Sequence, residues 1–441
     1  MARKVLKTLI TVFAALLTAE LLFLGFMFVT NREEAVEAMA DPTTAATTAA
    51  PTTAATTLPT ETASIPTTTA PVETTTAPTT EPQQLSYTLT FVGDCTLGSE
   101  PGKFASPHSF VGTVGENYDY PFANVLDYFE NDDLTLINLE GVFADSGYAQ
   151  DKTFTFRGPT AYTQILTGSS VEAVTLANNH SYDFGKSGYD TTKEVLEKAG
   201  VSYAEENKTC LITTESGLVV GIYADAFQFS TGEIAAHVEN LKKAGAEVIV
   251  CAFHWGTEGS YRANSAQEKY AKSAIDAGAD IVWGHHPHVL QKIEQYGDGV
   301  ILYSLGNFSF GGNHFPRDYD SAVVQQEVIR NADGTVSLGE LTLIPVSISS
   351  MSGQNNFQPT PYEAGSAEYD RVLSKLDGTF TGPDLVVNYE KETTPAATVP
   401  PQTAVPETQA PAATQAPVET QAPAPVETQA PAQPENNETS G

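Results

Sequence analysis

The feature that most constrains the fold is the stretch Ile281–His288, which reads I-V-W-G-H-H-P-H. Its apolar beginning ends at Gly284, and this pattern predicts a buried strand that stops at a tight turn. Three histidines follow within four positions. Open α/β sheets bind their ligands just past the carboxyl ends of strands, and neutral imidazole is a common metal ligand. The stretch therefore predicts a sheet with a metal site at its edge, with a polar surface turn as the alternative.

Other predicted strands also end in side chains that bind metals. Strands are predicted at residues 87–92, 134–138, 173–176 and 248–253. In that order they are followed by Asp94, by Glu140, by Asn179 and His180, and by His254. A single acid or amide after a strand is usually a helix cap or a turn former. Oxygen and nitrogen ligands at five strand ends instead predict one shared site, and this ligand set favours Mn, Fe or Zn.

The alternation of strands and helices marks one domain at residues 85–390. Helices are predicted at Gly188–Ala199, Ile234–Ala244 and Ala266–Ala277, each followed by a glycine that would end it, and a further helix at Pro121–Glu130. Strands at residues 300–303, 322–329 and 341–346 follow with little helix between them, which predicts a later antiparallel sheet. Alternating units first and strands afterwards indicate a layered α/β sandwich.

The N-terminal segment, residues 1–31, is predicted to be a membrane anchor. An apolar segment from Val5 to Val29 follows Arg3 and Lys4 and is long enough to cross a bilayer as a helix. The cations ahead of it predict a cytoplasmic N-terminus, so we expect a single-pass protein of the cell membrane with its domain extracellular. A cleaved signal peptide ending near Ala40 is the alternative, and it also places the domain outside.

Two tracts of biased composition flank the domain, at residues 32–84 and 391–441. They consist mostly of Thr, Pro and Ala, joined by Gln in the second tract. Such segments lack the apolar residues needed to offset chain entropy. We expect a disordered stalk and a disordered tail.

The charge of the chain excludes one class of partner. Its 54 acidic and 22 basic residues give a net charge of -32. Binding to nucleic acid requires clustered Lys and Arg to neutralise phosphates, and no basic stripe is present, so no nucleic-acid partner is expected. The three cysteines are widely spaced and odd in number, so no disulfide framework is implied.

The ordered motifs resemble a known family. F-V-G-D-x-x-L-G, N-L-E-G, A-N-N-H-x-x-D-x-G, H-W-G-x-E, G-H-H-P-H-V-L-Q and S-L-G-N-F are similar to those of CapA-type poly-γ-glutamate capsule biosynthesis proteins, within the calcineurin-like metallophosphoesterases. The similarity runs from Leu85 to about Met351. It implies an α/β fold, a layered α/β/β/α sandwich.

The resemblance implies roles for particular residues. The metal ligands for one or two divalent ions would be Asp94, Glu140, Asn179, His254, His286 and His288. His180 would protonate the leaving oxygen, and Asp183 would orient it. Two positions depart from the superfamily pattern, because Thr96 replaces a ligand histidine and the bridging acid is the longer Glu140.

Four further residues are candidates for substrate contact or support. Arg157 could grip an anionic substrate as a bidentate fork or simply face solvent. Glu258 could be an acid that supports the metal ligands without binding the metal, or a surface charge. His285 is expected to support the ligands, although a shift of register by one would exchange it with His286. Asn307 is expected to shape a turn.

The resemblance implies poly-γ-glutamate synthesis, export or anchoring. The protein would be a metal-dependent hydrolase or transferase acting on this acidic envelope polymer or its precursor, with capsule synthetase subunits as possible partners and the membrane contacted through the N-terminal helix. Two alternatives stay open. One is a non-catalytic scaffold or polymer-binding subunit, which Thr96 favours, and the other is an extracellular metal-dependent phosphatase.

Overall fold

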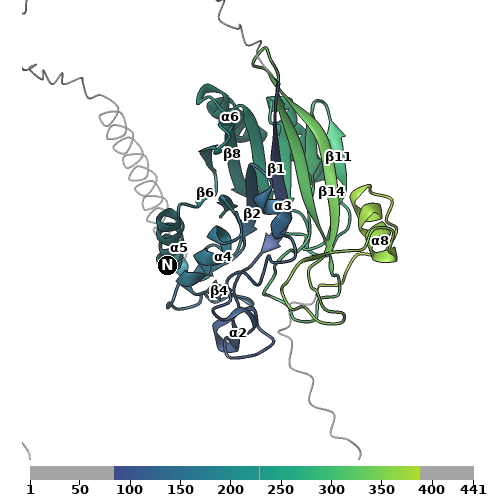
Figure 1. Ribbon diagram of the computed structural model, residues 1–441. Coiled ribbons are helices and arrows are strands. Elements are labelled where there is room, and N and C mark those ends of the chain that lie inside the picture. The colour runs from purple at the N-terminus through teal and green to yellow at the C-terminus, as the bar shows by residue number, and fades with distance from the viewer. Residues whose placement is uncertain (1–83, 228, 388–441) are drawn as a thin grey trace, which may run out of the picture. The chain divides into compact units, whose positions relative to one another are not determined.

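The computed structural model (Figure 1) describes residues 84–227 and 229–387. All of them belong to one compact unit, Pro78–Gly441. Within these ranges no helix is both long enough and apolar enough to span a membrane. The expected anchor and tail, and the stalk up to residue 83, lie outside the described residues, so they stay predictions.

The first sheet is mixed and has seven strands in the order β15-β14-β13-β1-β2-β5-β6. The strands β1, β2, β5 and β6 run parallel, whereas β13 pairs antiparallel with β1 and leads to β14 and β15. The bounds of these strands are β1 (Leu85–Cys95), β2 (Leu134–Leu139), β5 (Ala173–Thr175), β6 (Ser202–Ala204), β13 (Asp320–Arg330), β14 (Val336–Ser347) and β15 (Thr360–Pro361). The pairing of β13 with β14 confirms that two of the late strands are antiparallel.

The second sheet has six strands in the order β11-β12-β10-β9-β8-β7. Its four central strands run parallel, and the two outer strands are antiparallel to them. The bounds are β7 (Lys208–Thr213), β8 (Val219–Ala226), β9 (Val248–His254), β10 (Ile281–His285), β11 (Ile293–Tyr296) and β12 (Gly299–Leu302). The sequence prediction for residues 300–303 was wrong in one respect, because β12 pairs parallel with β10 instead of joining the late antiparallel strands. A two-stranded sheet of β3 (Val142–Phe143) and β4 (Arg157–Gly158) lies apart from both.

The two large sheets share an apolar core. It includes Leu89 of the first sheet and Val250 and Trp283 of the second. Successive side chains of a strand point to opposite faces, so Leu89 reaches this core while Val92 belongs to the cluster on the other face of β1. The indole Nε1 of Trp283 donates to the carbonyl of Val92 at 3.0 Å, which ties the two sheets together.

Helices cover the outer faces of both sheets. The helices α6 and α7 pack on the second sheet, and α4 and α5 pack on the first, each through its own apolar cluster. The result is a helix, sheet, sheet and helix layering (Figure 1). The bounds of the helices are α2 (Phe110–Val114), α3 (Leu126–Glu130), α4 (Thr163–Thr167), α5 (Gly185–Ala199), α6 (Thr231–Lys243), α7 (Ser265–Ala277) and α8 (Ala367–Leu376), with 3-10 turns at η1 (Pro101–Lys103) and η2 (Thr160–Tyr162).

Local sequence signals explain where the longer helices begin and end. Asn264 and Gln267 form a reciprocal capping box at the start of α7. The helix ends at Gly278, whose φ of 99° is accessible mainly to glycine. Gly200 ends α5 in the same way with φ 76°. The helix expected at residues 121–130 is wrong in its first half, because only Leu126–Glu130 is helical and the residues before it form turns.

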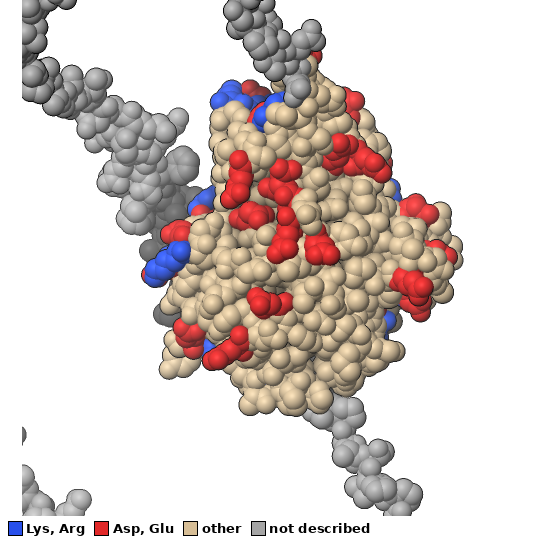
Figure 2. Space-filling view, viewed as in Figure 1, with Lys and Arg blue, Asp and Glu red and all other residues tan. Residues whose placement is uncertain are grey.

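The surface agrees with the acidic composition. Figure 2 shows many Asp and Glu side chains and few Lys and Arg on the face toward the viewer. No basic stripe is visible on that face.

Candidate metal centre

The strand ends named in the sequence meet at one place between the two sheets. Asp94 lies in β1, Glu140 follows β2, and His254 is the last residue of β9. His286 and His288 follow β10, and together with Asn179 these six side chains are called the ligand cluster below. The contacts among them range from hydrogen bonds of 2.9 Å to ion-pair distances of 3.8 Å.

Asp94 is held by several donors. It is fully buried, and its carboxylate accepts hydrogen bonds from the Asn138 amide at 2.9 Å and from the backbone N–H of His286 at 3.3 Å. The Nδ1 atoms of His285 and His288 each lie 3.1 Å from it. Burial alone would raise the pKa of Asp94, but its hydrogen bonds to the two histidines outweigh burial, and the pKa lies well below its usual range. Asp94 is therefore a fixed anion.

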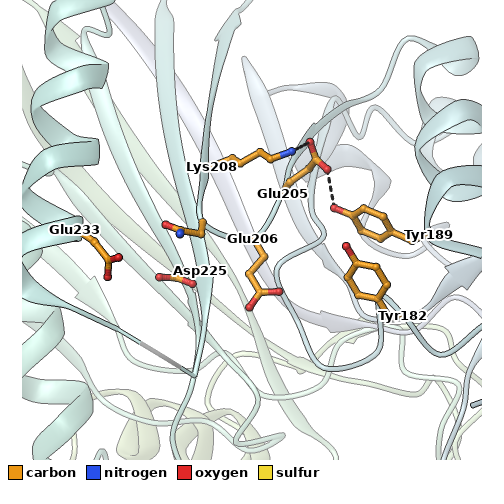
Figure 3. A pocket seen from close by; sticks show the side chains of 8 residues that line it. Tyr182, Tyr189, Glu205, Glu206, Lys208, Asp225 and Glu233 are labelled. Atoms are coloured by element: carbon orange, nitrogen blue, oxygen red, sulfur yellow. Dashed lines mark hydrogen bonds and ion pairs between the residues drawn. The ribbon is translucent and has the colours of Figure 1, made fainter. Parts of the chain in front are cut away.

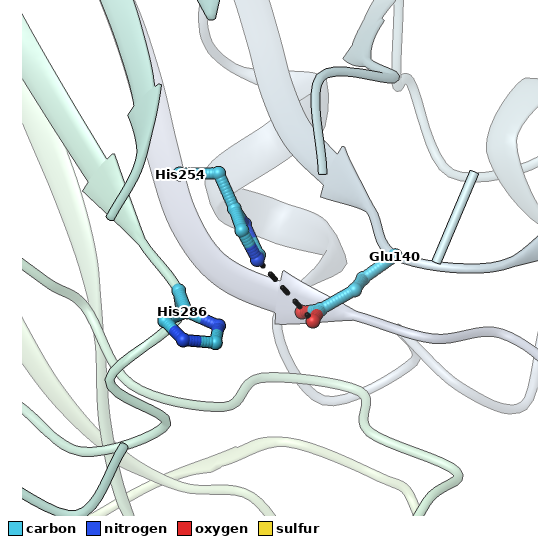
Figure 4. A group of neighbouring side chains, drawn as sticks. All are labelled: Glu140, His254 and His286. Carbon is cyan, nitrogen blue, oxygen red and sulfur yellow. Dashed lines mark ion pairs between the residues drawn. The ribbon is translucent and has the colours of Figure 1, made fainter. Parts of the chain in front are cut away.

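Glu140, unlike Asp94, accepts no hydrogen bond from the described part of the chain. It is fully buried, and neither carboxylate oxygen has a hydrogen-bond partner among the described residues. One oxygen lies 3.7 Å from Nε2 of His254 and 3.8 Å from Nε2 of His288, as Figure 4 shows for His254. Burial and the charge of Asp94 raise the pKa of Glu140 well above its usual value. A buried carboxylate without partners is costly unless a cation neutralises it.

Two imidazoles of the cluster offer free nitrogen atoms. The Nδ1 atoms of His254 and His286 are buried and have no hydrogen-bond partner in the described part of the chain. Burial and the neighbouring His286 hold the pKa of His254 well below its usual value, and burial with His288 lowers that of His286 to about 3. Both rings are therefore neutral, which is the state that binds metals.

The pKa of His288 is shifted in the opposite direction from those of His254 and His286. Burial alone would lower its pKa, but the charges of Glu140 and Asp94 outweigh burial and raise the pKa to about 10. Its Nδ1 also lies 2.9 Å from Oδ1 of Asn307. The same two carboxylates that favour a proton on His288 favour a cation beside it, and a metal bound there would displace that proton.

These residues fit a divalent metal. Three groups have ligand atoms within 4.8 Å of one another, namely Glu140 with His254 and His286, Asp94 with Glu140 and His288, and Glu258 with His286 and His288. An ion beside Glu140 would satisfy its unpartnered carboxylate, and the nitrogen of His254 that lies nearest to that carboxylate is Nε2. Carboxylate and imidazole ligands without cysteine suit Mn, Fe or Zn.

The turn after β10 has an unusual backbone conformation, which orients its two histidines. His286 has φ 93° and His288 has φ 55°, with Pro287 between them. Positive φ in a residue other than glycine costs of order 1–3 kcal/mol and persists where the surroundings enforce it. Here the backbone N–H of Gly259 donates to the carbonyl of Pro287 at 2.8 Å, and the N–H of His286 binds Asp94. The geometry thus places both rings in the cluster.

His180 and Asp183 form a pair next to the cluster. Nδ1 of His180 lies 2.7 Å from Oδ2 of Asp183, so Nε2 is the ring nitrogen that takes no part in this contact. The buried Asp183 also accepts from the backbone N–H of Phe156 at 2.7 Å and from Nζ of Lys152 at 2.5 Å. Burial lowers the pKa of His180. This arrangement is the one expected for a histidine oriented by an acid.

Asn179 and a lysine link this pair to the cluster. Nε2 of His254 lies 2.9 Å from Oδ1 of Asn179, and Nζ of Lys152 donates to the Asn179 carbonyl at 2.6 Å. Lys152 was not foreseen from the sequence, because it lies in a polar loop without a motif. Its contacts with Asn179 and Asp183 join residues that lie far apart in the sequence.

The four further candidates have different surroundings. Glu258 reaches His286 and His288, so it is close enough to be a ligand. His285 is buried against Trp283 and binds Asp94, and so supports the ligands. Asn307 bridges to Asp94 through its backbone and to His288 through its side chain.

Arg157 is not brought into the ligand cluster. Its guanidinium lies over the rings of Phe104 and Phe184 at 5.3 and 5.1 Å. Burial lowers its pKa, partly offset by the charge of Asp145. The contacts that the structure gives it place the cation on aromatic rings, where it stabilises the small β3–β4 region.

Two asparagines that hold Asp94 in place had no role assigned from the sequence. The Asn138 amide binds Asp94, and the Asn178 amide binds Oδ1 of Asn138 at 2.9 Å. Both lie at the strand ends that the sequence highlighted, so their position was the available signal. The Thr96 hydroxyl, at the position of the missing histidine ligand, is buried without a hydrogen-bond partner among the described residues.

A separate cavity of about 470 Å³ contains no residue of the ligand cluster in its lining. Figure 3 shows that Tyr182 and Tyr189 line one side of it and Glu233 the other, with Glu206 and Asp225 between them. The two tyrosine rings stack at 4.4 Å. Its walls are strongly acidic, so it disfavours anionic groups.

The fold and the ligand cluster together define an α/β protein with a candidate divalent-metal centre between two packed sheets. The chain matches the family described as "Bacterial capsule synthesis protein PGA_cap" over residues 88–312. It is 31% identical to the capsule biosynthesis protein CapA of Bacillus anthracis over 290 residues, which cover 59% of this chain and 67% of that protein. It is also 31% identical to the PGA biosynthesis protein CapA of Bacillus subtilis over 291 residues, or 59% and 74% of the two chains. The chain therefore belongs to the PGA_cap family of bacterial capsule synthesis proteins, which confirms the resemblance carried by its motifs.

Solved structures show more distant similarity. The NAD nucleotidase of Haemophilus influenzae matches with a TM-score of 0.34 and 12% identity, over 67% of this chain and 63% of that one. The 5'-nucleotidase of Candida albicans matches with a TM-score of 0.32 and 12% identity, over 65% and 56%. This chain thus spans less than two thirds of either nucleotidase, and similarity at this level does not extend to activity.

Proposed function

We propose that this protein acts in the synthesis, export or anchoring of poly-γ-glutamate through a metal-dependent hydrolase- or transferase-type site. The names of its Bacillus relatives, capsule biosynthesis protein and PGA biosynthesis protein, support the polymer. The observation that supports a metal site is the buried Glu140. Neither of its carboxylate oxygens has a hydrogen-bond partner among the described residues, although one oxygen lies 3.7 Å from Nε2 of His254 and 3.8 Å from Nε2 of His288.

The fold we propose is the α/β/β/α sandwich of calcineurin-like metallophosphoesterases. Two sheets pack face to face with helices outside, and the ligand cluster lies at the carboxyl ends of parallel strands, where α/β sheets bind ligands. The motif order in the sequence supports the same assignment.

A divalent metal in the cluster would polarise a phosphoryl or carbonyl oxygen of the substrate. The chain's own residues supply the rest of the site. Asp94 and Glu140 provide negative charge, and the neutral rings of His254 and His286 provide nitrogen ligands. His180, held by Asp183 through Nδ1, would exchange a proton with the substrate through Nε2, and because burial lowers its pKa it must take up that proton before it can give it to a leaving group; such a step typically contributes about 10²–10⁴-fold in rate.

The location we propose is the outer face of the cell membrane. The apolar segment from Val5 to Val29 supports an anchor, and the flanking Thr- and Pro-rich tracts support spacers through the envelope. In that place the domain would meet the polymer, its precursor or the synthetase subunits.

Metal retention tests this proposal. The full-length protein, purified gently in detergent without chelator, should retain Mn, Fe or Zn when measured by elemental analysis. His286→Ala combined with His288→Ala should lose it, because each of the three groups of neighbouring ligand atoms contains one or both of these histidines. The control is His237→Ala, since His237 stacks on Tyr223 away from the cluster. A wild-type protein without metal, or a double variant that retains it, contradicts the proposal.

A non-catalytic scaffold is the second candidate function. The buried, unpartnered hydroxyl of Thr96 favours it, because a ligand histidine is absent at that position. Complementation separates the two functions in a capsule-forming strain that lacks this gene. Asp94→Ala and His180→Ala variants that restore full polymer would favour the scaffold, whereas loss of polymer at wild-type protein levels supports the metal-dependent site.

A further inference from the structure

Phe227 occupies a special position beside the ligand cluster. It is the first residue after β8, whose last residue Ala226 pairs with His254 of β9. The backbone N–H of Phe227 donates to the carbonyl of His254 at 3.1 Å. The register of two neighbouring parallel strands therefore fixes where this side chain begins.

The backbone of Phe227 is strained. Its φ is 59°, in the left-handed region that bulky residues rarely adopt. Glycine or asparagine at this position would avoid most of the cost. Strain of this kind is concentrated at functional sites, where the surrounding structure maintains it.

The ring covers two imidazoles of the cluster. Its centroid lies 5.3 Å from that of His254 and 4.9 Å from that of His286, with interplanar angles of 80° and 86°. Such edge-to-face contacts are favourable for aromatic rings. The geometry places Phe227 against the two side chains that offer free ligand nitrogens.

The other side of the same ring faces solvent. Phe227 is 48% exposed, whereas His254 and His286 are 0% and 9% exposed. Phe227 is also absent from the four apolar clusters that make up the core of the described residues. A large ring at a strained position, which contributes little to the core, thus presents its exposed surface next to two metal-ligand candidates.

We propose that Phe227 is a specificity-determining residue whose exposed ring contacts the organic part of a substrate while the anionic group of that substrate binds at the ligand cluster. This inference rests on the proposed metal-dependent function and narrows its substrate class. The substrate carries an apolar or flat group directly beside its metal-binding anion. The methylenes and amide planes of a glutamyl chain meet this requirement, whereas inorganic phosphate does not.

A pair of phosphonates tests the contact without turnover. Methylphosphonate and phenylphosphonate carry the same anionic group and differ in the apolar part. Their binding to Mn-loaded full-length protein is measured by calorimetry. The wild type should prefer phenylphosphonate by about two- to tenfold, the range expected for one aromatic contact.

The variants separate contact from folding. Phe227→Ala should remove the preference and leave both methylphosphonate and Mn binding within about twofold, and Phe227→Tyr should keep the preference. Phe315→Ala is the matched control, because Phe315 is similarly exposed at 54% and packs on His314 instead of the cluster. The melting temperature of Phe227→Gly should equal or exceed that of the wild type, because glycine relieves the strain.

Each other outcome has a defined meaning. A wild type without preference, or a preference retained in Phe227→Ala, overturns the inference and leaves the metal centre intact. Loss of Mn binding in Phe227→Ala also overturns it, because the ring would then serve only to hold the imidazoles. A wild type that binds no Mn overturns the proposed function together with this inference.

Discussion

At the scale of single residues, Glu140 differs from its neighbour Asp94 although both are fully buried acids. Asp94 accepts bonds from an asparagine, two histidines and a backbone N–H. Glu140 has no hydrogen-bond partner among the described residues. Native structures rarely leave a buried charge in this state, so the unsatisfied carboxylate is best explained as a ligand.

This contrast predicts the behaviour of Glu140→Gln. In EDTA at pH 8 the variant should be more stable than the wild type by about 1–3 kcal/mol, because a neutral amide replaces a buried acid that has no hydrogen-bond partner among the described residues. With Mn at 100 times its Kd the wild type should gain about 2.7 kcal/mol, which offsets most or all of that advantage. Thermal unfolding with and without Mn measures both effects.

The control for this prediction is an acid on the surface. Glu239→Gln removes half of an exposed pair with Lys243 and should change stability by less than about 0.5 kcal/mol in either buffer. If Glu140→Gln is destabilising in EDTA, Glu140 serves the fold through contacts that its geometry does not reveal, and the ligand interpretation fails.

At the scale of elements, the end of β10 depends on close approach to its neighbours. A Cβ atom added at Gly284 would lie 2.2 Å from the carbonyl oxygen of Tyr303 and 2.5 Å from Nε1 of Trp255. The glycine in G-H-H-P-H is therefore required by packing, and it lets the strand lie near the chain that follows β12.

Gly284→Ala should consequently destabilise the protein by about 3 kcal/mol or more, since backbone must move to admit the methyl group. Urea unfolding measures the change. Gly102→Ala is the matched control, because its Cβ would meet no atom within 4 Å. Equal stability of the two variants would show that β10 and its neighbours are looser than the structure indicates.

The sequence predicted strands best where apolar runs are buried on both sides. β9 and β10 were foreseen within two residues because Val248–Phe253 and Ile281–Trp283 are continuous apolar segments. The sheet to which each strand belongs was not readable, so β12 was assigned to the wrong partners. Pairing depends on contacts far apart in the chain, and local composition does not encode it.

The helix α8 shows a signal that was present and overlooked. Ser366 caps it by accepting from the N–H of Tyr369, and Val372 and Leu376 are buried one turn apart. The ligand cluster, by contrast, was predictable because each member directly follows a strand. Phe227 and Lys152 were not predictable, since a positive φ and a contact across a loop leave no pattern in the sequence.

At the scale of the whole molecule, α8 is joined to the first sheet by a buried charge network. Asp320, at the start of β13, accepts two hydrogen bonds from Arg371 and one from Lys375, each at 2.7 Å. Burial alone would raise the pKa of Asp320, but these bonds outweigh burial and lower the pKa. The network therefore links folding to pH.

The sign of this linkage follows from the lowered pKa. Because the folded-state pKa lies below the unfolded value of about 3.9, the stabilisation is complete above that pH and is lost as pH falls through the folded value. Asp320→Asn should cost about 1–3 kcal/mol at pH 7, since the buried Lys375 loses one of its two carboxylate partners and keeps only Asp318. It should also flatten the acid part of the profile of unfolding free energy against pH.

Asp190→Asn is the control for this profile, because Asp190 forms an exposed pair with Lys186. It should keep the wild-type acid slope and change stability little, because exposed ion pairs are weak. An Asp320→Asn protein with the same slope as the wild type would show that other carboxylates control acid unfolding.

The central claim is that the strand ends of two sheets build one metal centre. Anomalous X-ray scattering from crystals grown with Mn tests it most directly, because it locates the ion itself. The account predicts a peak within about 2–2.5 Å of a Glu140 oxygen and of a nitrogen of His254, His286 or His288. A fully ordered cluster with no peak at saturating Mn, or a peak only at surface carboxylates, would contradict it.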